Sequence, residues 1–429
     1  MSFPKYSKYK DSGVEWLGDV PEHWNVVSVK RRMLLRTEKT ARRQNPVGLE
    51  NIESWTGRFV PTETEFEGDG VEFETGDILF GKLRPYLAKV HLADGPGEAV
   101  GDFHVMRPHE EFVGRFAQYC LLCREFIAIV DGSTFGSKMP RASWEFVSTM
   151  KTPVPPFHEQ TLIADFLDRE TSKIDSLVAE QRRLIELLKE KRQAVISHAV
   201  TKGLNPHAPM KPSGIEWLGD VPEHWAVTPL AHLCDCISYG FTNPMPTIDE
   251  GPYLLTANDI DYGKVNYECA RRTTYQAFRA DLTEKSRPKL NDILLTKDGT
   301  LGRVAIHGGQ EACINQSVAL LRVKTESIVP QFLAVALLGG IHQARMIYDA
   351  GGTTIKHIYI SRLGKMPVAY PTLSEQADVV RFLNKETAKL DGLISEAERA
   401  IELLQERRTA LISAAVTGKI DVRNLGRTN

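Results

Sequence analysis

The chain contains two copies of one sequence motif, separated by about half of its 429 residues. Residues 11–26 read DSGVEWLGDVPEHWNV and residues 212–227 read PSGIEWLGDVPEHWAV, so 13 of 16 positions are identical at a constant offset of 201. A second pair of segments, 159–201 and 375–417, matches at 23 of 43 positions with an offset of 216. Because a fixed internal period is the signature of a repeated structural unit, the chain is predicted to be a tandem duplication.

The two blocks between the repeats, 27–155 and 228–371, differ from each other. They share only short stretches, such as Gly-Asp-Ile-Leu at 76–79 and Asn-Asp-Ile-Leu at 291–294, and the second block is 15 residues longer. The two halves therefore share a frame, made of the short motif and the long repeated segment, and differ in the block between these two parts. A protein that presents two different surfaces on one frame is suited to reading two different things.

The second repeat has the pattern of a long amphipathic helix in each half. Its apolar residues are spaced by three, four and seven positions, which is typical of helices that pack as coiled coils. At 1.5 Å per residue, each helix would extend about 65 Å. Neither helix can bury its apolar stripe alone, so we expect the two to pack as an antiparallel coiled coil rather than to stand as separate structural helices. The residues expected at this helix interface are Leu167, Ile174, Leu177, Leu184, Leu188, Leu383, Leu390, Leu393, Leu404 and Leu411.

The variable blocks are predicted to mix strands and helices, which places the whole chain in the α+β class. Residues 292–296 and 303–307 have the pattern of strands, as do 78–80 and 86–91, whereas 112–130 and 329–348 have helical character. Prolines end each block before its long helix. We therefore expect seven segments: a repeat motif at 1–26, a variable block at 27–155, a long helix at 156–204, a linker with the second motif at 205–227, a second variable block at 228–371, a second long helix at 372–420 and a tail at 421–429.

Composition narrows the class of protein further. Apolar residues make up 42% and charged residues 25%, as in a globular chain, and the net charge of −2 provides no global positive field for nucleic acid. Any nucleic-acid surface must therefore be local. The polar N-terminus has no signal-peptide pattern, the charge-free stretch 327–344 is interrupted by Pro and Gly, and the six cysteines are too few for a disulfide framework. We expect a cytoplasmic protein.

The sequence has none of the common short catalytic motifs. An amino-methyltransferase needs an Asn/Asp-Pro-Pro-aromatic turn, and the nearest stretches, 94–97 and 243–246, do not fit it. Every Gly-Lys pair lacks the hydroxyl residue and the upstream glycine of a phosphate-binding loop. The cysteines do not have the spacing of a structural zinc site, and His23 and His224 have no visible catalytic partner. We therefore expect no catalytic residue and no metal site, which favours a binding protein.

The duplicated frame resembles the specificity subunits of Type I restriction-modification enzymes, and this resemblance covers essentially the whole chain. It is carried by the repeated motif, by the Glu-Gln pairs that start the long helices and by the Ala-Val-Thr triplets that end them. These motifs lie at 13–24 and 214–225, at 159–160 and 375–376, and at 199–201 and 415–417.

In that family, each variable block is a target recognition domain that reads one half of a split DNA sequence. The resemblance implies that the long helices space the two domains and bind two methylation subunits, through which restriction subunits join. It also implies that this chain is no enzyme by itself and binds no cofactor. The partner subunits would use S-adenosylmethionine, ATP and Mg2+ for adenine methylation and for DNA translocation and cleavage.

Basic residues beside glycine turns are the best candidates for contact with double-stranded DNA. Lys and Arg near glycine can approach phosphates, and Arg, Lys, Asn and Gln favour the edges of bases. Both blocks place such residues at comparable positions, although a solvated surface charge is an equally good interpretation of any one of them. The candidates are Lys82, Arg84, Lys138 and Arg141 in the first block and Lys297, Arg303, Lys356 and His357 in the second.

Two other functions are compatible with the sequence. A stand-alone DNA-binding regulator would bind its site tightly without partners, whereas a specificity subunit would need its methylation subunit. A coiled-coil scaffold would show no sequence preference at any salt concentration.

Overall fold

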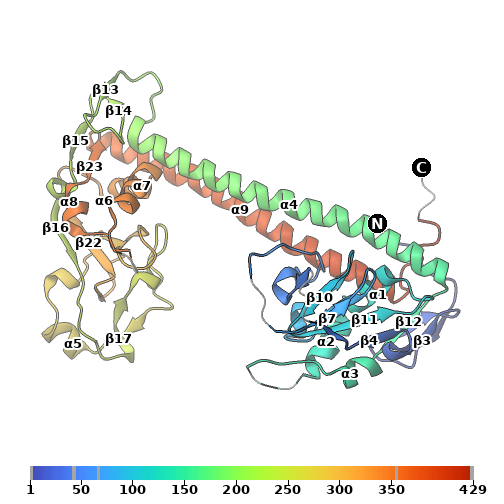
Figure 1. The fold of residues 1–429 in the computed structure, drawn as a ribbon. Helices are drawn as coiled ribbons and strands as arrows, with labels where there is room; N and C mark the ends of the chain where they lie inside the picture. Colours follow the sequence, from blue (N-terminus) through green and yellow to red (C-terminus); the bar gives the residue numbers. More distant parts are fainter. Residues whose placement is uncertain are drawn as a thin grey trace. The chain divides into compact units, whose positions relative to one another are not determined.

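The computed structural model describes residues 3–40, 45–64, 68–134, 136, 138–352 and 356–425. The chain divides into two compact units: unit 1 consists of Met1–Arg182 and Glu398–Asn429, and unit 2 consists of Arg183–Ala397. Each unit contains one variable block, one copy of the repeat motif and parts of both long helices (Figure 1). The predicted α+β class and tandem duplication are confirmed.

Each variable block is built on the same four-stranded antiparallel sheet. The strand order is β4-β11-β8-β9 in unit 1 and β16-β22-β19-β20 in unit 2. The registers also agree, because Met106 pairs with Ile78 where Leu321 pairs with Ile293. The central strands β8 and β19 are short, apolar and wholly buried, as expected for strands covered on both faces. The bounds are β4 Met33–Arg36, β8 Ile78–Gly81, β9 Val90–Leu92, β11 Phe103–Pro108, β16 Cys234–Tyr239, β19 Ile293–Thr296, β20 Val304–Ile306 and β22 Val318–Val323.

An ion pair braces this sheet at the same place in both units. Arg107 donates two hydrogen bonds of 2.8 Å to Asp77, and Arg322 donates to Asp292 from Nε at 3.0 Å and from Nη2 at 2.6 Å. Both aspartates are buried, and each also accepts the backbone N–H of the residue three positions earlier. A bidentate arginine and a backbone donor satisfy a buried carboxylate. The pair therefore anchors the turn that leads into each central strand.

The second sheet differs between the units. Its order is β5-β7-β10-β6 in unit 1 and β18-β17-β21 in unit 2. Within the described residues both contain a parallel pair, β6 with β10 or β17 with β21, and a 3-10 helix follows β6 or β17. The two second sheets therefore share the parallel pair and differ in the strands around it. The bounds are β5 Lys39–Thr40, β6 Pro46–Val47, η2 Leu49–Asn51, β7 Gly70–Phe73, β10 Gly97–Val100, β17 Ile248–Leu255, η5 Ala257–Asp259, β18 Arg271–Arg272 and β21 Ala312–Ile314.

Short helices pack on the sheets. The stretches 112–130 and 329–348, which we predicted to be helical, form two helices each, because the chain turns at Cys123 and at Gly339. The bounds are α1 Gly114–Leu121, α2 Arg124–Gly132, α3 Trp144–Thr149, α5 Tyr275–Ala280, α6 Pro330–Leu338, α7 Gly340–Asp349 and α8 Ile360–Lys365. The remaining 3-10 helices are η1 Val29–Arg31, η3 Pro85–Leu87, η4 Leu230–Leu233 and η6 Glu284–Ser286.

Paired strands bring the two ends of each variable block together. In unit 1, β3 (Asn25–Ser28) leads into the block and pairs with β12 (Lys151–Val154), which leads out of it. In unit 2, β15 (Ala226–Pro229) pairs with β23 (Pro367–Tyr370) in the same way. Because the paired strands hold the start and the end of each block together, the sequence between them can change without moving either end. The motifs themselves form the hairpins β1 Tyr9–Asp11 with β2 Asp19–Pro21 and β13 Met210–Pro212 with β14 Asp220–Pro222.

The Glu-His-Trp end of each motif holds the first turn of a long helix. In unit 1, Trp24 Nε1 donates to Glu159 Oε1 at 3.0 Å, and His23 Nε2 lies 2.8 Å from Oε2. In unit 2, the equivalent Trp-His pair contacts Glu375 at 3.1 and 2.8 Å. One repeated contact therefore accounts for the His-Trp ending that the two motifs share, and both histidines have a structural partner.

The glutamine that follows this glutamate ties the long helix to the variable block. Gln160 accepts the N–H of Val113, the residue before α1, at 2.8 Å, and donates to the carbonyls of Glu111 and Pro155. Gln376 makes the same three kinds of contact in unit 2, at 2.7, 3.2 and 2.9 Å. Both glutamines are buried, so each is a fully used hydrogen-bonding link rather than a surface residue.

The long helices α4 (Phe157–Lys202) and α9 (Leu373–Val416), green and red in Figure 1, run in opposite directions. In unit 1 the first part of α4 packs against the last part of α9, and in unit 2 the last part of α4 contacts the first part of α9. The predicted antiparallel coiled coil is confirmed. Buried positions along the middle of α4 are spaced by three, four or seven residues, as in coiled coils: Leu167, Thr171, Ile174, Val178, Ile185 and Leu188.

Three residues that we expected at the helix interface lie outside it. Leu177, Leu184 and Leu393 are exposed by 45%, 42% and 48%. Because one residue turns a helix by about 100°, the neighbouring positions face inward instead. These neighbours are Val178 and Ile185, which are buried, and Ile394, which is half-buried. The other expected residues, Leu167, Ile174, Leu188, Leu383, Leu390 and Leu411, are buried, and Leu404 is half-buried.

One ion pair crosses between the two helices in each unit. Arg408 Nε lies 3.0 Å from Asp175 Oδ1 in unit 1, and Arg192 Nε lies 2.9 Å from Asp391 Oδ1 in unit 2. The repeat offset of 216 relates the two pairs residue by residue. They differ in environment, since the side chains are 10% and 22% exposed in unit 1 but 28% and 53% exposed in unit 2.

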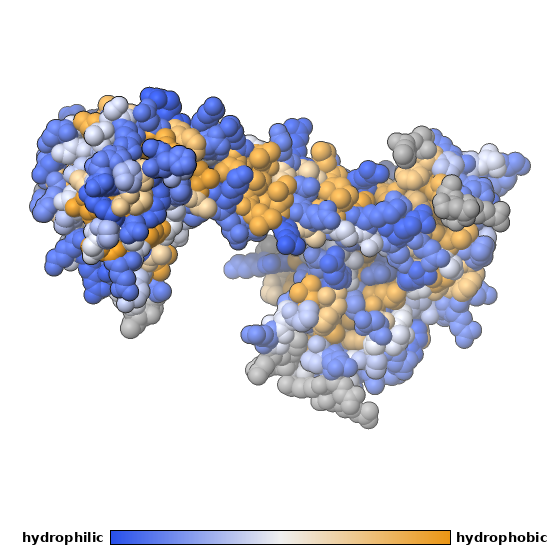
Figure 2. Space-filling model, turned by 90° about the horizontal axis from the view of Figure 1, so that it is seen from above, coloured by the Kyte–Doolittle hydropathy of each residue, from blue (hydrophilic) through white to orange (hydrophobic). Residues whose placement is uncertain are grey.

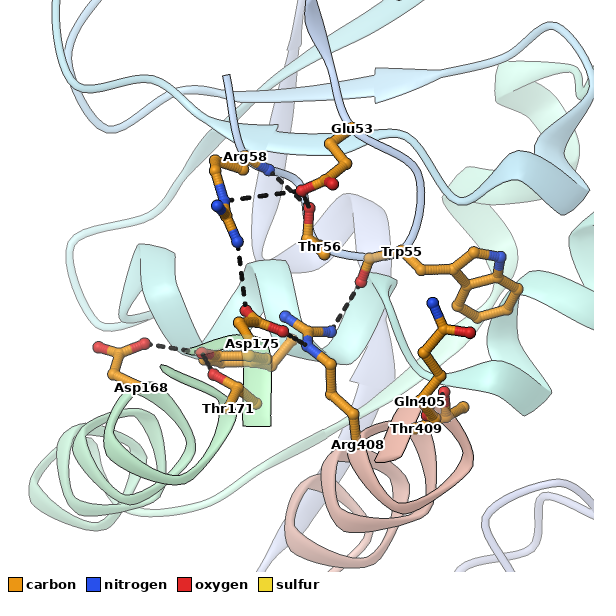
Figure 3. A network of polar contacts seen from close by, with 11 residues as sticks. Glu53, Trp55, Thr56, Arg58, Asp168, Thr171, Asp175, Gln405, Arg408 and Thr409 are labelled. Atoms are coloured by element: carbon orange, nitrogen blue, oxygen red, sulfur yellow. Dashed lines mark hydrogen bonds and ion pairs between the residues drawn. The ribbon is translucent and has the colours of Figure 1, made fainter. Parts of the chain in front are cut away.

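In unit 1, a loop of the variable block covers this ion pair (Figure 3). Arg408 also donates to the carbonyl of Trp55 at 2.8 Å, and Arg58 lies 3.7 Å from Asp175. The loop turns at Gly57, whose φ of 70° and close approach to a backbone carbonyl, 2.0 Å from an ideal Cβ, exclude a side chain. A cavity of about 1080 Å³ lies beside these contacts. The variable block of unit 1 is thus fastened to both long helices at once.

The apolar core of each unit joins the four-stranded sheet to the long helices. In unit 1, Phe80 and Phe126 belong to the same cluster as Leu411, and in unit 2, Phe332 belongs to the same cluster as Leu383. The described part of the chain contains no helix that is both long and apolar enough to cross a membrane.

Candidate nucleic-acid interface

Lys82 and Lys297 occupy equivalent positions in the two sheets. Each directly follows the central strand, β8 or β19. The backbone N–H of Lys82 donates to the carbonyl of Asp102 at 2.8 Å, and that of Lys297 donates to Ser317 at 2.9 Å. The two acceptors stand one residue before β11 and β22, so they are equivalent as well. Two of the basic residues singled out in the sequence thus share one place in the frame.

Arg141 and His357 share a second place in the frame. The backbone N–H of the residue after each one donates to the carbonyl of Lys82 or Lys297, at 2.9 Å in both units. Arg141 bridges to Leu83, and His357 bridges to the residue after Lys297, in the same antiparallel manner. The fold therefore brings together side chains that are far apart in the sequence.

In unit 1, these cations meet the carboxylate of Asp102. Arg141 donates from Nε to Oδ1 and from Nη2 to Oδ2, both at 2.9 Å, while Lys82 Nζ lies 3.9 Å from Oδ1. The Arg141 side chain is 47% exposed and that of Asp102 is 22% exposed. The hydrogen bond to Asp102 raises the pKa of Arg141, which remains a cation at every relevant pH. The cluster thus presents a charged guanidinium that is held from one side.

In unit 2, the corresponding side chains, Lys297 and His357, meet the carboxylate of Asp298. Lys297 Nζ lies 2.9 and 3.0 Å from the two carboxylate oxygens, and His357 Nδ1 lies 2.7 Å from Oδ1. Lys297 also lies over the half-exposed ring of Tyr239, 5.4 Å from its centroid. Held at Nδ1, the half-buried imidazole of His357 keeps Nε2 for another partner.

The two aspartates reach the same place from different positions in the chain. Asp102 stands before β11, where unit 2 has Ser317, whereas Asp298 follows Lys297, where unit 1 has Leu83. Sequence reasoning missed both, because it searched for cations and an acidic residue is not expected on a surface that faces phosphates. The adjacent Lys-Asp pair was a signal for Asp298, but no sequence feature pointed to Asp102.

The remaining candidates fall into two groups. Arg84, Lys138 and Lys356 are exposed on loops near these clusters or in neighbouring turns. Arg84 adopts a left-handed backbone conformation, with a φ of 51°, and its N–H donates to the carbonyl of Pro140 at 2.9 Å. That bond places Arg84 beside the segment that carries Arg141.

Arg303 differs from the other candidates because it is directed into the domain. It is half-buried and donates from Nη1 to the carbonyl of Ile260 at 3.3 Å. Lys89 precedes β9 as Arg303 precedes β20, and its Nζ donates to the carbonyl of Leu49 at 2.7 Å. Both cations therefore hold the segment around the 3-10 helix, which is a structural role.

Four of the six cysteines are buried, and no metal cluster is found among the described residues. No group of three or more His, Cys, Asp and Glu side chains there could hold a metal ion. Burial raises the pKa of Cys123, of Cys234 and of Cys313 to about 12, so these thiols stay protonated and unreactive.

Comparison with known proteins agrees with this description. Residues 245–403 match the family model of the Type I restriction modification DNA specificity domain. The Type I restriction enzyme EcoBI specificity subunit of Escherichia coli is 26% identical over 305 residues, which cover 69% of this chain and just 64% of that protein. The Type I restriction enzyme EcoKI specificity subunit of Escherichia coli is 22% identical over 442 residues, covering 94% of this chain and 90% of that protein.

The fold also has a solved counterpart. A chain in a structure described as the basis of complex assembly and conformational transition of the type I R-M system has a TM-score of 0.71 and 16% sequence identity. The similarity covers 92% of this chain and 98% of that one, so the whole arrangement of elements within the units is shared. These comparisons confirm the resemblance that the repeated motifs indicated: the chain is similar to the specificity subunits of Type I restriction-modification systems.

Proposed function

We propose that this chain is the DNA-reading, non-catalytic subunit of a Type I restriction-modification complex. Each variable block reads one half of a split, asymmetric DNA target. The long helices set the spacing of the two half-sites and bind two methylation subunits, and restriction subunits join through these. S-adenosylmethionine, ATP and Mg2+ are used by the partner subunits and not by this chain.

One observation carries the proposal: the two blocks combine a four-stranded sheet of the same strand order with different surfaces. The strand-end lysine is the same in both, but its companions are Arg141 in unit 1 and His357 in unit 2. The second sheets differ in strand number and order. Two blocks that place the strand-end lysine identically but surround it with different side chains would bind phosphates in the same way and read different bases.

The exposed leucines of the long helices support two docking sites for like partners. Leu177 and Leu393 are equivalent by the repeat offset, as are Leu187 and Leu403, and all four are exposed by 45% to 57%. Unit 1 contains Leu177 and Leu403, and unit 2 contains Leu187 and Leu393. Apolar side chains are visible at the surface of the helices (Figure 2). A repeated apolar surface is suited to covering by two copies of one protein.

An exchange of variable blocks tests the proposal. Because β3 and β12 pair as β15 and β23 do, the residues between the first pair can be replaced by those between the second. We expect the altered chain, with its methylation subunits, to methylate a palindrome built from the second half-site. Mapping of adenine methylation across the host genome, with this gene present, deleted or altered, measures the result.

The unaltered gene restored to the deletion strain is the control. Tight, sequence-specific binding without methylation subunits would favour the stand-alone regulator instead. A methylation pattern that does not change when the blocks are exchanged would remove the variable blocks from sequence recognition.

A further inference from the structure

The aspartates in the two cation clusters present an electrostatic problem. A carboxylate beside phosphates is repelled, and the chain nevertheless places one at the same point of both variable blocks. They come from non-equivalent positions, so the duplicated frame alone does not account for them. Each is more buried than the side chain that it holds at the outer edge, Arg141 or His357. The carboxylate lies behind and the exposed nitrogen group lies in front, which is the arrangement of a supporting residue and the group that it positions.

The hydrogen bonds in unit 1 determine which edge of Arg141 is left. Asp102 takes Nε and Nη2, which form one side of the guanidinium plane. The end of the plane, formed by Nη1 and the second hydrogen of Nη2, keeps two parallel N–H donors. Two parallel donors match the O6 and N7 acceptors of guanine in the major groove. A fixed guanidinium also loses less conformational entropy on binding than a free one.

The hydrogen bond in unit 2 has the same effect on a different side chain. Asp298 holds His357 through Nδ1 at 2.7 Å, which fixes the ring and leaves one nitrogen, Nε2, facing away. A single nitrogen makes one hydrogen bond where the guanidinium end makes two. Lys297 shares Asp298, so the same carboxylate also limits the reach of the strand-end cation.

We infer that Asp102 and Asp298 are positioning residues for base reading: Asp102 aims Arg141 at a guanine in the first half-site, and Asp298 aims His357 at a base in the second. This inference rests on the proposed function, since it assigns roles within the same two surfaces. It adds that the base-specific contact of each block is made by the outer side chain, Arg141 or His357, and that the carboxylate behind it determines specificity without touching DNA.

The test uses the complete complex with its methylation subunits and duplexes in which each half-site position is varied in turn. Arg141→Lys keeps the charge but loses the paired donors, and Asp102→Asn keeps the size but loses one of the two bonds that orient Arg141. We expect both to lower the preference for guanine at one and the same position of the first half-site, by about 5- to 100-fold. The second half-site should be read as before. Asp298→Asn is the matched control, with the reverse pattern.

The readouts separate the inference from the function on which it rests. A wild-type complex without base preference in either half would overturn the proposed function. A selective wild-type complex whose preferences are unchanged by Arg141→Lys would overturn only the inference. So would an Asp102→Asn variant that weakens methylation equally on all sequences, or an effect at a position that is not guanine. Because Arg141 is an exposed side chain, its variant tests the assignment even where Asp102→Asn fails to assemble.

Discussion

Unit 1 and unit 2 share the contact between the repeat motif and a long helix and the ion pair between the long helices, but both contacts are more buried in unit 1. The buried Glu159 receives hydrogen bonds from Trp24, His23 and also Tyr6, whereas Glu375 has only the Trp-His pair among its described partners. The side chain of Glu159 is 6% exposed and that of Glu375 is 30% exposed. The interhelical ion pair shows the same contrast, since in unit 1 a loop covers it. Identical motifs therefore do not imply equal stability, because residues outside the repeat determine how well the shared contact is shielded from solvent.

The largest contrast is expected from removal of the glutamates. Glu159→Ala leaves three donors of unit 1 without an acceptor, two of them buried, and burial raises the pKa of Tyr6 so that its hydroxyl cannot shed the proton. We expect a loss of about 3 to 5 kcal/mol in the free energy of unfolding of unit 1, against about 1 to 2 kcal/mol in unit 2 for Glu375→Ala. Urea unfolding followed by hydrogen exchange in peptides of each unit measures both. Equal losses would show that the burial of Glu159 adds nothing.

The interhelical arginines should give the next largest difference. Arg408→Leu removes the buried partner of Asp175, which keeps only Arg58 at 3.7 Å, and leaves the Trp55 carbonyl without its donor, so we expect a loss of about 2 to 3 kcal/mol in unit 1. Arg192→Leu breaks a more exposed pair and should cost less than about 1 kcal/mol in unit 2. Thermal unfolding of the two variants compares them. If Arg192→Leu were the more damaging, the covering loop would not be the cause of the contrast.

A third contrast depends on pH. His342 is fully buried and packs edge-on against Trp217, at the place where unit 1 has Phe126 against Trp16. Burial lowers the pKa of His342 from 6.5 to about 4. Between these values the unfolded chain binds a proton that the folded chain does not, so the free energy of unfolding falls as the pH falls from about 6.5 to 4.

The expected loss over this window is about 2 to 3 kcal/mol, and it should appear in unit 2. His342→Phe copies the residue of unit 1 and should remove the pH dependence that this group contributes. Unfolding curves at pH 7 and pH 4.5 of the wild-type and variant chains measure the difference. A variant with the same pH profile as the wild type would rule out His342 as the titrating group.

The smallest effect on stability is expected at the exposed leucines. Leu177→Lys and Leu393→Lys change equivalent surface positions and should alter stability by no more than about 0.5 kcal/mol, while each weakens the docking of one methylation subunit. Ile185→Lys is the buried control, and it should cost several kcal/mol because a charge enters the apolar interface. Sedimentation of mixtures with the methylation subunit measures assembly. Two full binding sites in both surface variants would exclude these leucines from the docking surface.

The frame was predictable from the sequence because duplication is visible without knowledge of structure. The positions of the helices and of the central strands followed from apolar spacing. The helix interface was less accurate: Leu177, Leu184 and Leu393 were assigned to it although the adjacent residues face inward. A stripe of mixed spacings contains two neighbouring helical faces, and only the partner helix decides between them.

The candidate interface was predictable only in part. Lys82, Lys297, Arg141 and His357 could be named from basic residues and glycine turns, but their convergence depends on strand register, which the sequence does not state. Asp102 could not be named, because a separate segment of the chain brings it to Lys82 and Arg141, whereas Asp298 had a signal in its position directly after Lys297. Arg303 has the same local sequence signals as the others and yet faces inward, toward Ile260.

The division of the chain into units has a consequence for its synthesis on the ribosome. Unit 2 is continuous, whereas unit 1 needs its last residues: Asp421 N–H donates to the carbonyl of Pro4 at 2.8 Å, and the Tyr9 hydroxyl donates to the carbonyl of Gly418. The first part of α4 therefore emerges long before the part of α9 that covers it. At about 5 to 20 residues per second, it waits on the order of 10 to 40 seconds. The half of the chain made first is thus completed last, and a nascent chain that stops early would leave an apolar stripe open to chaperones and proteases.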